Sequence, residues 1–143
     1  MTYNEKKRFL EGYVSSLKRI KGLQREIEEW ETIATSTTQK LKEINIHSND
    51  VTSKVENCAI KIADMQDLLL EEMEEAEYNR QVISEAIKCI RDTRRRDLIE
   101  MRYVHCVPVR IIAEDMNKCT DDIYKMIRKT IKKMDIELTD RRF

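Results

Sequence analysis

Apolar side chains recur at every seventh residue through the middle of this sequence. The six positions are Val55, Ile62, Leu69, Ala76, Ile83 and Ile90. Such a repeat keeps one apolar seam facing a partner helix when two helices wind around each other in a left-handed supercoil. Two glycines and one proline in 143 residues also favour long helices over a sheet. The sequence therefore predicts an all-α fold built on a coiled coil.

The nearest partner for this helix is the segment that precedes it. Apolar residues recur at steps of three and four from residue 4 to about residue 44, which predicts a long amphipathic helix. A polar stretch at about 45–52 is typical of a loop, and Ser53 and Glu56 then match the S-x-x-E pattern of a capping box. Residues 1–92 are therefore predicted to form a long antiparallel helical hairpin. A second subunit is an alternative partner, and both pairings can apply, because a two-helix hairpin has little core of its own.

The charges are unevenly distributed, although the formal net charge is zero. Residues 1–93 carry 14 Lys and Arg against 18 Asp and Glu, a net charge of −4. Residues 94–143 carry 13 against 9, a net charge of +4. This asymmetry indicates an acidic scaffold followed by a basic functional region.

Shorter helices are predicted after residue 92. Residues 94–103 form an amphipathic segment, and Pro108 stands where proline is favoured, at the first position of a helix that ends near Met116. Asn117 can adopt the left-handed conformation that a tight turn needs when glycine is missing. Another helix follows at about 120–134. Helix, short turn and helix at this spacing predict a helix-turn-helix module over residues 93–143.

The last predicted helix has two distinct faces. Its buried stripe consists of Ile123, Ile127, Thr130, Ile131 and Met134. At about 100° per residue, the opposite side carries the charged residues that would enter a DNA major groove. With the flanking hydroxyl and lysine side chains included, the predicted DNA-binding residues are Thr120, Asp121, Tyr124, Lys125, Arg128, Lys129, Lys132 and Lys133.

Two features of this module leave alternatives open. Asp121 and Asp122 favour the positive end of the helix dipole, and Asp121 can pair with Lys125 four residues on. Alternatively, Asp121 accepts a hydrogen bond from a cytosine amino group in the major groove. The triplet Arg94–Arg96 would either contact phosphates or cover the junction with the hairpin.

The stretch "DLIEMRYVHCVPVRIIAEDMNKCTDDIYKMIRKTIKKM" resembles region 4 of bacterial sigma-70-type factors over about residues 94–134. The matching residues are Met101-Arg102-Tyr103, Ile112-Ala113-Glu114, Met116, Ile123-Tyr124 and Lys132-Lys133-Met134. Asn117 and Cys119 stand where the family pattern has a turn glycine and a capping serine. The whole chain is similar in architecture to small phage proteins of the sigma-like or ArpU/RinA late-gene regulator type.

The resemblance implies a DNA-binding transcription regulator of a phage or integrated element, located in the cytoplasm of a bacterial host cell. The expected partners are double-stranded DNA, RNA polymerase and a second copy of the chain, which would form a homodimer through the hairpin. An alternative is a sigma-like adaptor that binds polymerase or another protein and no DNA. A purely structural coiled coil would leave the basic helix unexplained.

Other functional classes find little support in the sequence. No apolar run is long enough for a membrane span, and the charged N-terminus does not match a secretory signal. The cysteines form no CxxC motif and no metal-ligand spacing, so neither a metal site nor a cofactor is expected. His105 and Cys106 are adjacent but lack the surroundings of a nucleophile and its base. The chain is therefore not expected to be an enzyme.

Overall fold

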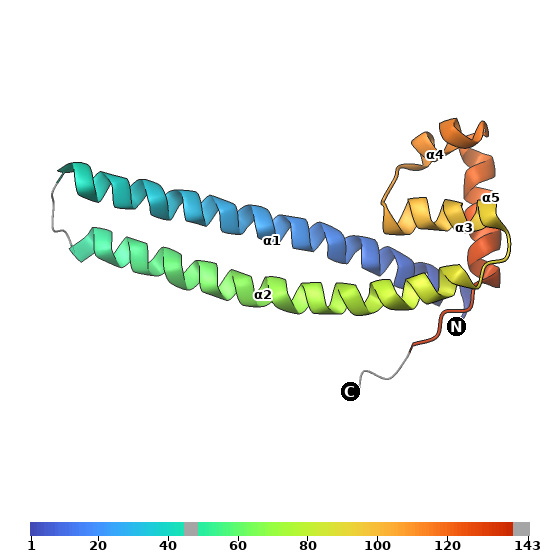
Figure 1. The fold of residues 1–143 in the computed structure, drawn as a ribbon, viewed down its shortest axis with the longest axis horizontal. Helices are drawn as coiled ribbons and strands as arrows, with labels where there is room; N and C mark the ends of the chain where they lie inside the picture. The colour runs from blue at the N-terminus through green and yellow to red at the C-terminus, as the bar shows by residue number, and fades with distance from the viewer. Residues whose placement is uncertain (45–48, 139–143) are drawn as a thin grey trace. The chain divides into compact units, whose positions relative to one another are not determined.

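Every secondary-structure element of the computed structural model is helical over the residues that it describes, 1–44 and 49–138. The elements are α1 (Tyr3–Ile44), α2 (Asn49–Lys88), α3 (Thr93–Ile99), the π-helical η1 (Glu100–Val104), α4 (Val109–Met116) and α5 (Thr120–Lys133) (Figure 1). The predicted all-α class is confirmed. In these two ranges, no helix combines the length and the apolar character needed to cross a bilayer.

Close contacts divide the chain into two compact units. The core unit combines Met1–Ser16 with Ala76–Phe143, and the helix-pair unit is Leu17–Glu75. This division differs from the boundary at residue 92 expected from the sequence, because the beginning of α1 and the end of α2 pack with the helices that follow. Whether the chain has separable domains at residue 92 stays a prediction.

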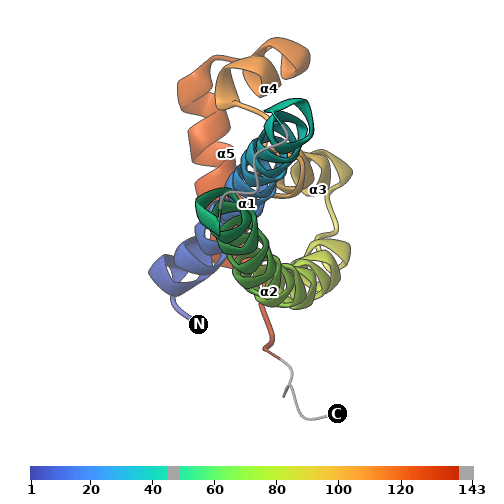
Figure 2. The same ribbon diagram turned by 90° about the vertical axis from the view of Figure 1, so that its left-hand side faces the viewer.

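The helix-pair unit contains the larger part of α1 and of α2, which run antiparallel and side by side (Figure 1, Figure 2). Its apolar seam is thin. Ile27 and Cys58 are buried, whereas the heptad residues Val55, Ile62 and Leu69 are half-buried. Two helices alone therefore leave part of the seam in contact with solvent.

Polar contacts cross the seam of the helix-pair unit at its edges. Arg19 Nε lies 3.2 Å from Glu72 Oε1, and Lys61 Nζ lies 5.2 Å from the centroid of the Trp30 ring. Several large apolar side chains remain exposed on the same unit: Ile33, Ile60, Leu68, Leu70 and Met73. The unit thus has more apolar surface than its own two helices cover.

The core unit has a closely packed interior to which each of its α-helices contributes. The fully buried aliphatic side chains are Leu10 from α1, Ile83 from α2, Leu98 and Ile99 from α3, Ile112 from α4, and Ile123 and Ile131 from α5. The heptad positions Ala76 and Ile83 are both buried here. The predicted seam of α2 therefore continues into this interior.

The segment that follows α2 contains a capped helix start at Asp92 and a residue with positive φ at Cys106. The Asp92 carboxylate accepts a hydrogen bond of 3.0 Å from the backbone N–H of Arg94, which caps the start of α3. Helix α3 continues into η1, after which Cys106 adopts a positive φ of 55°. Burial of Tyr103, the buried residue of η1, raises the pKa of its hydroxyl to about 12.

Three local predictions need correction. Residues 49–52, expected in the loop, form the first turn of α2, while residues 45–48 of that loop lie outside the described residues. Ser53 is therefore inside α2 and cannot form a capping box with Glu56 at the helix start. Pro108 is the N-cap of α4, one residue before its expected place, and its carbonyl accepts a 3.2 Å hydrogen bond from the Ile112 N–H.

Candidate nucleic-acid interface

Helix α5 is strongly two-sided, as its sequence predicts. Ile123, Ile127, Thr130 and Ile131 are buried, as is Met134 at its C-cap. Thr130, the polar member of the stripe, donates its hydroxyl to the Met126 carbonyl at 2.7 Å, so burial leaves that group satisfied. The buried stripe determines which side of α5 faces outward.

The surface of α5 outside its buried stripe includes all eight predicted DNA-binding residues. Each of them is exposed: Thr120, Asp121, Tyr124, Lys125, Arg128, Lys129, Lys132 and Lys133. The five cations of this set, Lys125, Arg128, Lys129, Lys132 and Lys133, form the basic face of α5. As far as the described residues go, no carboxylate lies within ion-pair distance of the basic face. Its positive charge is therefore available to an outside partner.

Asp121 and Asp122 occupy the first turn of α5, and Lys132 and Lys133 its last turn. This order complements the helix dipole at both ends. The expected ion pair between Asp121 and Lys125 is not formed among the described side chains. The favourable interaction with the helix dipole is therefore the structural reason that remains for Asp121. The Asp121 carboxylate is exposed to solvent.

The turn between α4 and α5 depends on Asn117, which has φ 52° and ψ 45° as predicted. The Lys118 N–H donates to the Ala113 carbonyl at 3.0 Å, and the Asn117 N–H donates to the Glu114 carbonyl at 3.3 Å. These two bonds form a Schellman motif, which satisfies the free carbonyls at the end of α4. The chain can then begin α5 after Lys118 and Cys119.

Replacing Asn117 by alanine is expected to lower the free energy of unfolding by about 1 kcal/mol, because a Cβ-bearing residue without a short polar side chain is strained at positive φ. The free energy of unfolding of Asn117→Gly should equal or exceed that of the wild type, since glycine adopts this conformation without strain. Chemical denaturation followed by circular dichroism measures both. Asn57→Ala, at an exposed position inside α2, is the control and should be neutral or slightly stabilising. Equal losses in the two alanine variants would contradict the role of the turn.

The first turn of α1 also contributes to this surface. The Tyr3 ring centroid lies 5.6 Å from the Arg128 guanidinium carbon and 5.9 Å from Lys132 Nζ. Lys6, only 9% exposed, donates its ammonium to the Lys132 carbonyl at 3.3 Å. Sequence reasoning missed both residues, because no local pattern connects positions more than 120 residues apart.

The alternatives left open for Arg94–Arg96 are partly resolved. Arg96 covers the junction between α2 and α3, where its Nε and Nη2 donate to the Ile90 carbonyl at 3.1 and 2.7 Å. Arg95 is partly buried, with Nε 3.8 Å from Asp92 Oδ2. Arg94 is exposed. Of the three side chains, Arg94 is thus the one most accessible to a phosphate.

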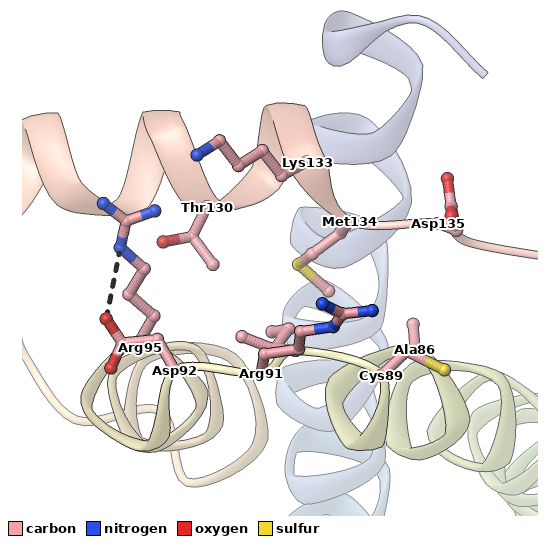
Figure 3. Close-up of a pocket in the computed structure, with 10 residues that line it drawn as sticks. Ala86, Cys89, Arg91, Asp92, Arg95, Thr130, Lys133, Met134 and Asp135 are labelled. Atoms are coloured by element: carbon pink, nitrogen blue, oxygen red, sulfur yellow. Dashed lines mark ion pairs between the residues drawn. The ribbon is translucent and has the colours of Figure 1, made fainter.

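A cavity of about 390 Å³ lies in the core unit beside the end of α5 (Figure 3). Its lining residues are Ala86, Cys89, Ile90, Arg91, Asp92, Arg95, Thr130, Lys133, Met134 and Asp135. Figure 3 shows the guanidinium groups of Arg91 and Arg95 directed toward opposite ends. Two of the lining polar groups already have partners within the chain: Arg95 is paired with Asp92, and the Thr130 hydroxyl donates to the Met126 carbonyl.

The cysteine and histidine side chains do not assemble into a site within the described ranges. In that part of the chain, no three His, Cys, Asp or Glu side chains are grouped to hold a metal ion. His105 is exposed, with Nε2 3.9 Å from Glu100 Oε1, and Cys106 is exposed at the end of η1. The basic face therefore remains the strongest candidate site.

Comparisons with known proteins return no match to any family model, curated protein or solved structure. The resemblance to sigma-70 region 4 accordingly stays an expectation based on the residues quoted from the sequence. The exposed basic face of α5 and the contacts that hold it are the features of the molecule that bear on its function.

Proposed function

We propose that this chain is a DNA-binding transcription regulator of a phage or integrated element, acting in the cytoplasm of a bacterial host. In this proposal, residues 1–92 form a helical hairpin and α4, the Asn117 turn and α5 form a helix-turn-helix. Helix α5 would lie in the major groove. One observation carries the proposal: the basic face of α5 is exposed, and no described carboxylate pairs with it.

The form of this surface favours a duplex as its partner. Five cations lie on one rigid helix of 14 residues. A helix of that length spans roughly 21 Å, and the major groove is wide enough to admit it. A protein that neutralises phosphates with Lys and Arg gains affinity by releasing the counterions condensed on DNA. A basic helix that packs on a folded core through its apolar stripe and leaves its cations exposed meets these requirements.

The order of residues along α5 also suits this docking. Helix-turn-helix proteins contact base edges with the first residues of the recognition helix. In α5 those positions hold Thr120, Asp121 and Tyr124, all exposed and all able to form hydrogen bonds. The cations lie further along, where they would contact phosphates and position the helix.

One such module would bind DNA weakly, so the proposal includes self-association or a polymerase partner. Exposed apolar side chains on the helix-pair unit, such as Leu68 and Leu70, support pairing with a second copy. The half-buried seam of that unit supports it too, because a second helix pair would cover more of the seam. Mass measurement in solution tests this part of the proposal.

Titration of a labelled random-sequence duplex at rising salt tests the proposed function. If the five cations contact phosphates, the slope of log K against log salt should be about −4 to −5. Affinity should then fall roughly 100- to 1,000-fold between 50 and 200 mM salt. A flat salt dependence, or no binding at low salt, would exclude the proposal.

The second candidate is an adaptor that binds RNA polymerase or another protein without touching DNA. The exposed carboxylates of Asp121 and Asp122 favour this candidate, because carboxylates repel phosphates. Tyr124, which is 55% exposed, also favours it, because aromatic residues are enriched at protein interfaces. The salt titration separates the two candidates. An adaptor would show no duplex binding, and its capture of purified polymerase would not change when DNA is removed.

A further inference from the structure

The first turn of α1 is anchored independently of the contacts that Tyr3 makes. Thr2 and Glu5 form a capping box, in which the Thr2 N–H donates to Glu5 Oε2 at 2.9 Å and the Glu5 N–H donates to Thr2 Oγ1 at 3.3 Å. Leu10, two turns on, is fully buried in the core unit. The backbone that carries Tyr3 is therefore held by the fold.

Lys6 connects this turn to the end of α5. Its ammonium donates to the Lys132 carbonyl, which belongs to the last turn of α5. A cation is favoured at this end of a helix, because the unpaired carbonyls carry partial negative charge. The contact brings the first turn of α1 and the cationic end of α5 together within the core unit.

Tyr3 then meets two members of the basic face. Arg128 and Lys132 are four residues apart on α5, so they are neighbours on one side of the helix and repel each other. The Tyr3 ring lies within 6 Å of both charges, and the negative face of an aromatic ring attracts cations. Both cations nevertheless remain exposed. The ring contacts them without covering them.

We propose that Tyr3 is a positioning residue for DNA binding, holding Arg128 and Lys132 side by side on the surface that meets the phosphates. The inference rests on the proposed function and adds the N-terminal turn of α1 to its site. Long cationic side chains lose rotamer freedom when they bind. A ring that restrains two of them beforehand reduces this loss, so the contact strengthens binding.

The test compares Tyr3→Leu with Tyr3→Phe, which keeps the ring, on the same labelled random-sequence duplex at several salt concentrations. Tyr3→Leu is expected to bind about two- to five-fold more weakly, and Tyr3→Phe to bind like the wild type. In the background of Arg128→Ala with Lys132→Ala, the Tyr3→Leu effect should disappear. A general loss of stability would persist in that background. Thermal melting followed by circular dichroism checks that each variant is folded.

The contact itself has a direct readout in the free protein. Ring-current shifts of the Arg128 and Lys132 side-chain protons should be present in the wild type and in Tyr3→Phe, and absent in Tyr3→Leu. Unchanged shifts overturn the inference. So does a Tyr3→Leu variant that binds the duplex as tightly as, or more tightly than, the wild type.

The outcomes also separate this inference from the proposed function. If the wild-type chain shows no salt-dependent duplex binding, both fail. If the wild type binds with a steep salt dependence and Tyr3→Leu binds identically, the positioning role fails and the proposed function stands.

Discussion

Replacing Lys125 and Arg128 together by glutamate is expected to weaken duplex binding roughly 100- to 1,000-fold. Both side chains are exposed on the basic face, and each change turns an attraction to phosphate into a repulsion of about 1 kcal/mol or more. Losing two phosphate contacts should also make the salt dependence shallower by about two units of slope. Fluorescence anisotropy with a labelled duplex measures both quantities.

A matched control comes from the helix-pair unit. Lys18 and Lys21 are exposed on α1 with the same spacing of three residues, so Lys18→Glu with Lys21→Glu makes the same change in net charge. This control should bind within about two-fold of the wild type if the docking surface is α5, because neither lysine belongs to the basic face and salt screens exposed charges that do not contact the DNA. Equal losses in both double variants would mean that net charge, and not the basic face, drives binding.

Replacing Ile123 by alanine is expected to lower the free energy of unfolding of the core unit by about 2–5 kcal/mol. Ile123 has 0% exposure and belongs to the buried stripe of α5, so truncation leaves a cavity in the interior. The loss is a large part of the roughly 5–15 kcal/mol that stabilises a typical domain. Urea denaturation followed by circular dichroism gives the value.

The control for this variant is Ile111→Ala in α4, where the same side chain is 39% exposed. It should cost about 1 kcal/mol or less, because little apolar surface is returned to water and no closed cavity forms. The single tryptophan, Trp30, lies in the helix-pair unit and reports separately on that unit. Similar losses for Ile111→Ala and Ile123→Ala would contradict the assigned interior.

Much of the local structure could be predicted from the residues. The length of α1, the two faces of α5 and the left-handed turn at Asn117 were all expected, because each follows from a short-range pattern. Side-chain periodicity sets which side of a helix is apolar, and backbone sterics restrict which residues tolerate positive φ. Neither depends on distant contacts.

Capping illustrates where such patterns mislead. Ser53 and Glu56 have the same spacing and chemistry as Thr2 and Glu5, but only the latter pair forms a capping box. A cap requires a non-helical residue with free N–H groups after it. Residues 49–52 are already helical, so Ser53 has no free helix start to cap. The pattern alone could not distinguish the two places.

From its sequence alone, this chain is determined to be helical, with a heptad seam along α2 and a basic helix near its C-terminus. Only the tertiary structure decided that the beginning of α1 and the end of α2 join the C-terminal helices in one core, and that Tyr3 and Lys6 contact α5. The reason is physical: the periodicity of apolar residues shows which side of a helix is favoured for burial, but not which distant segment covers that side. That choice depends on how the buried side chains pack together.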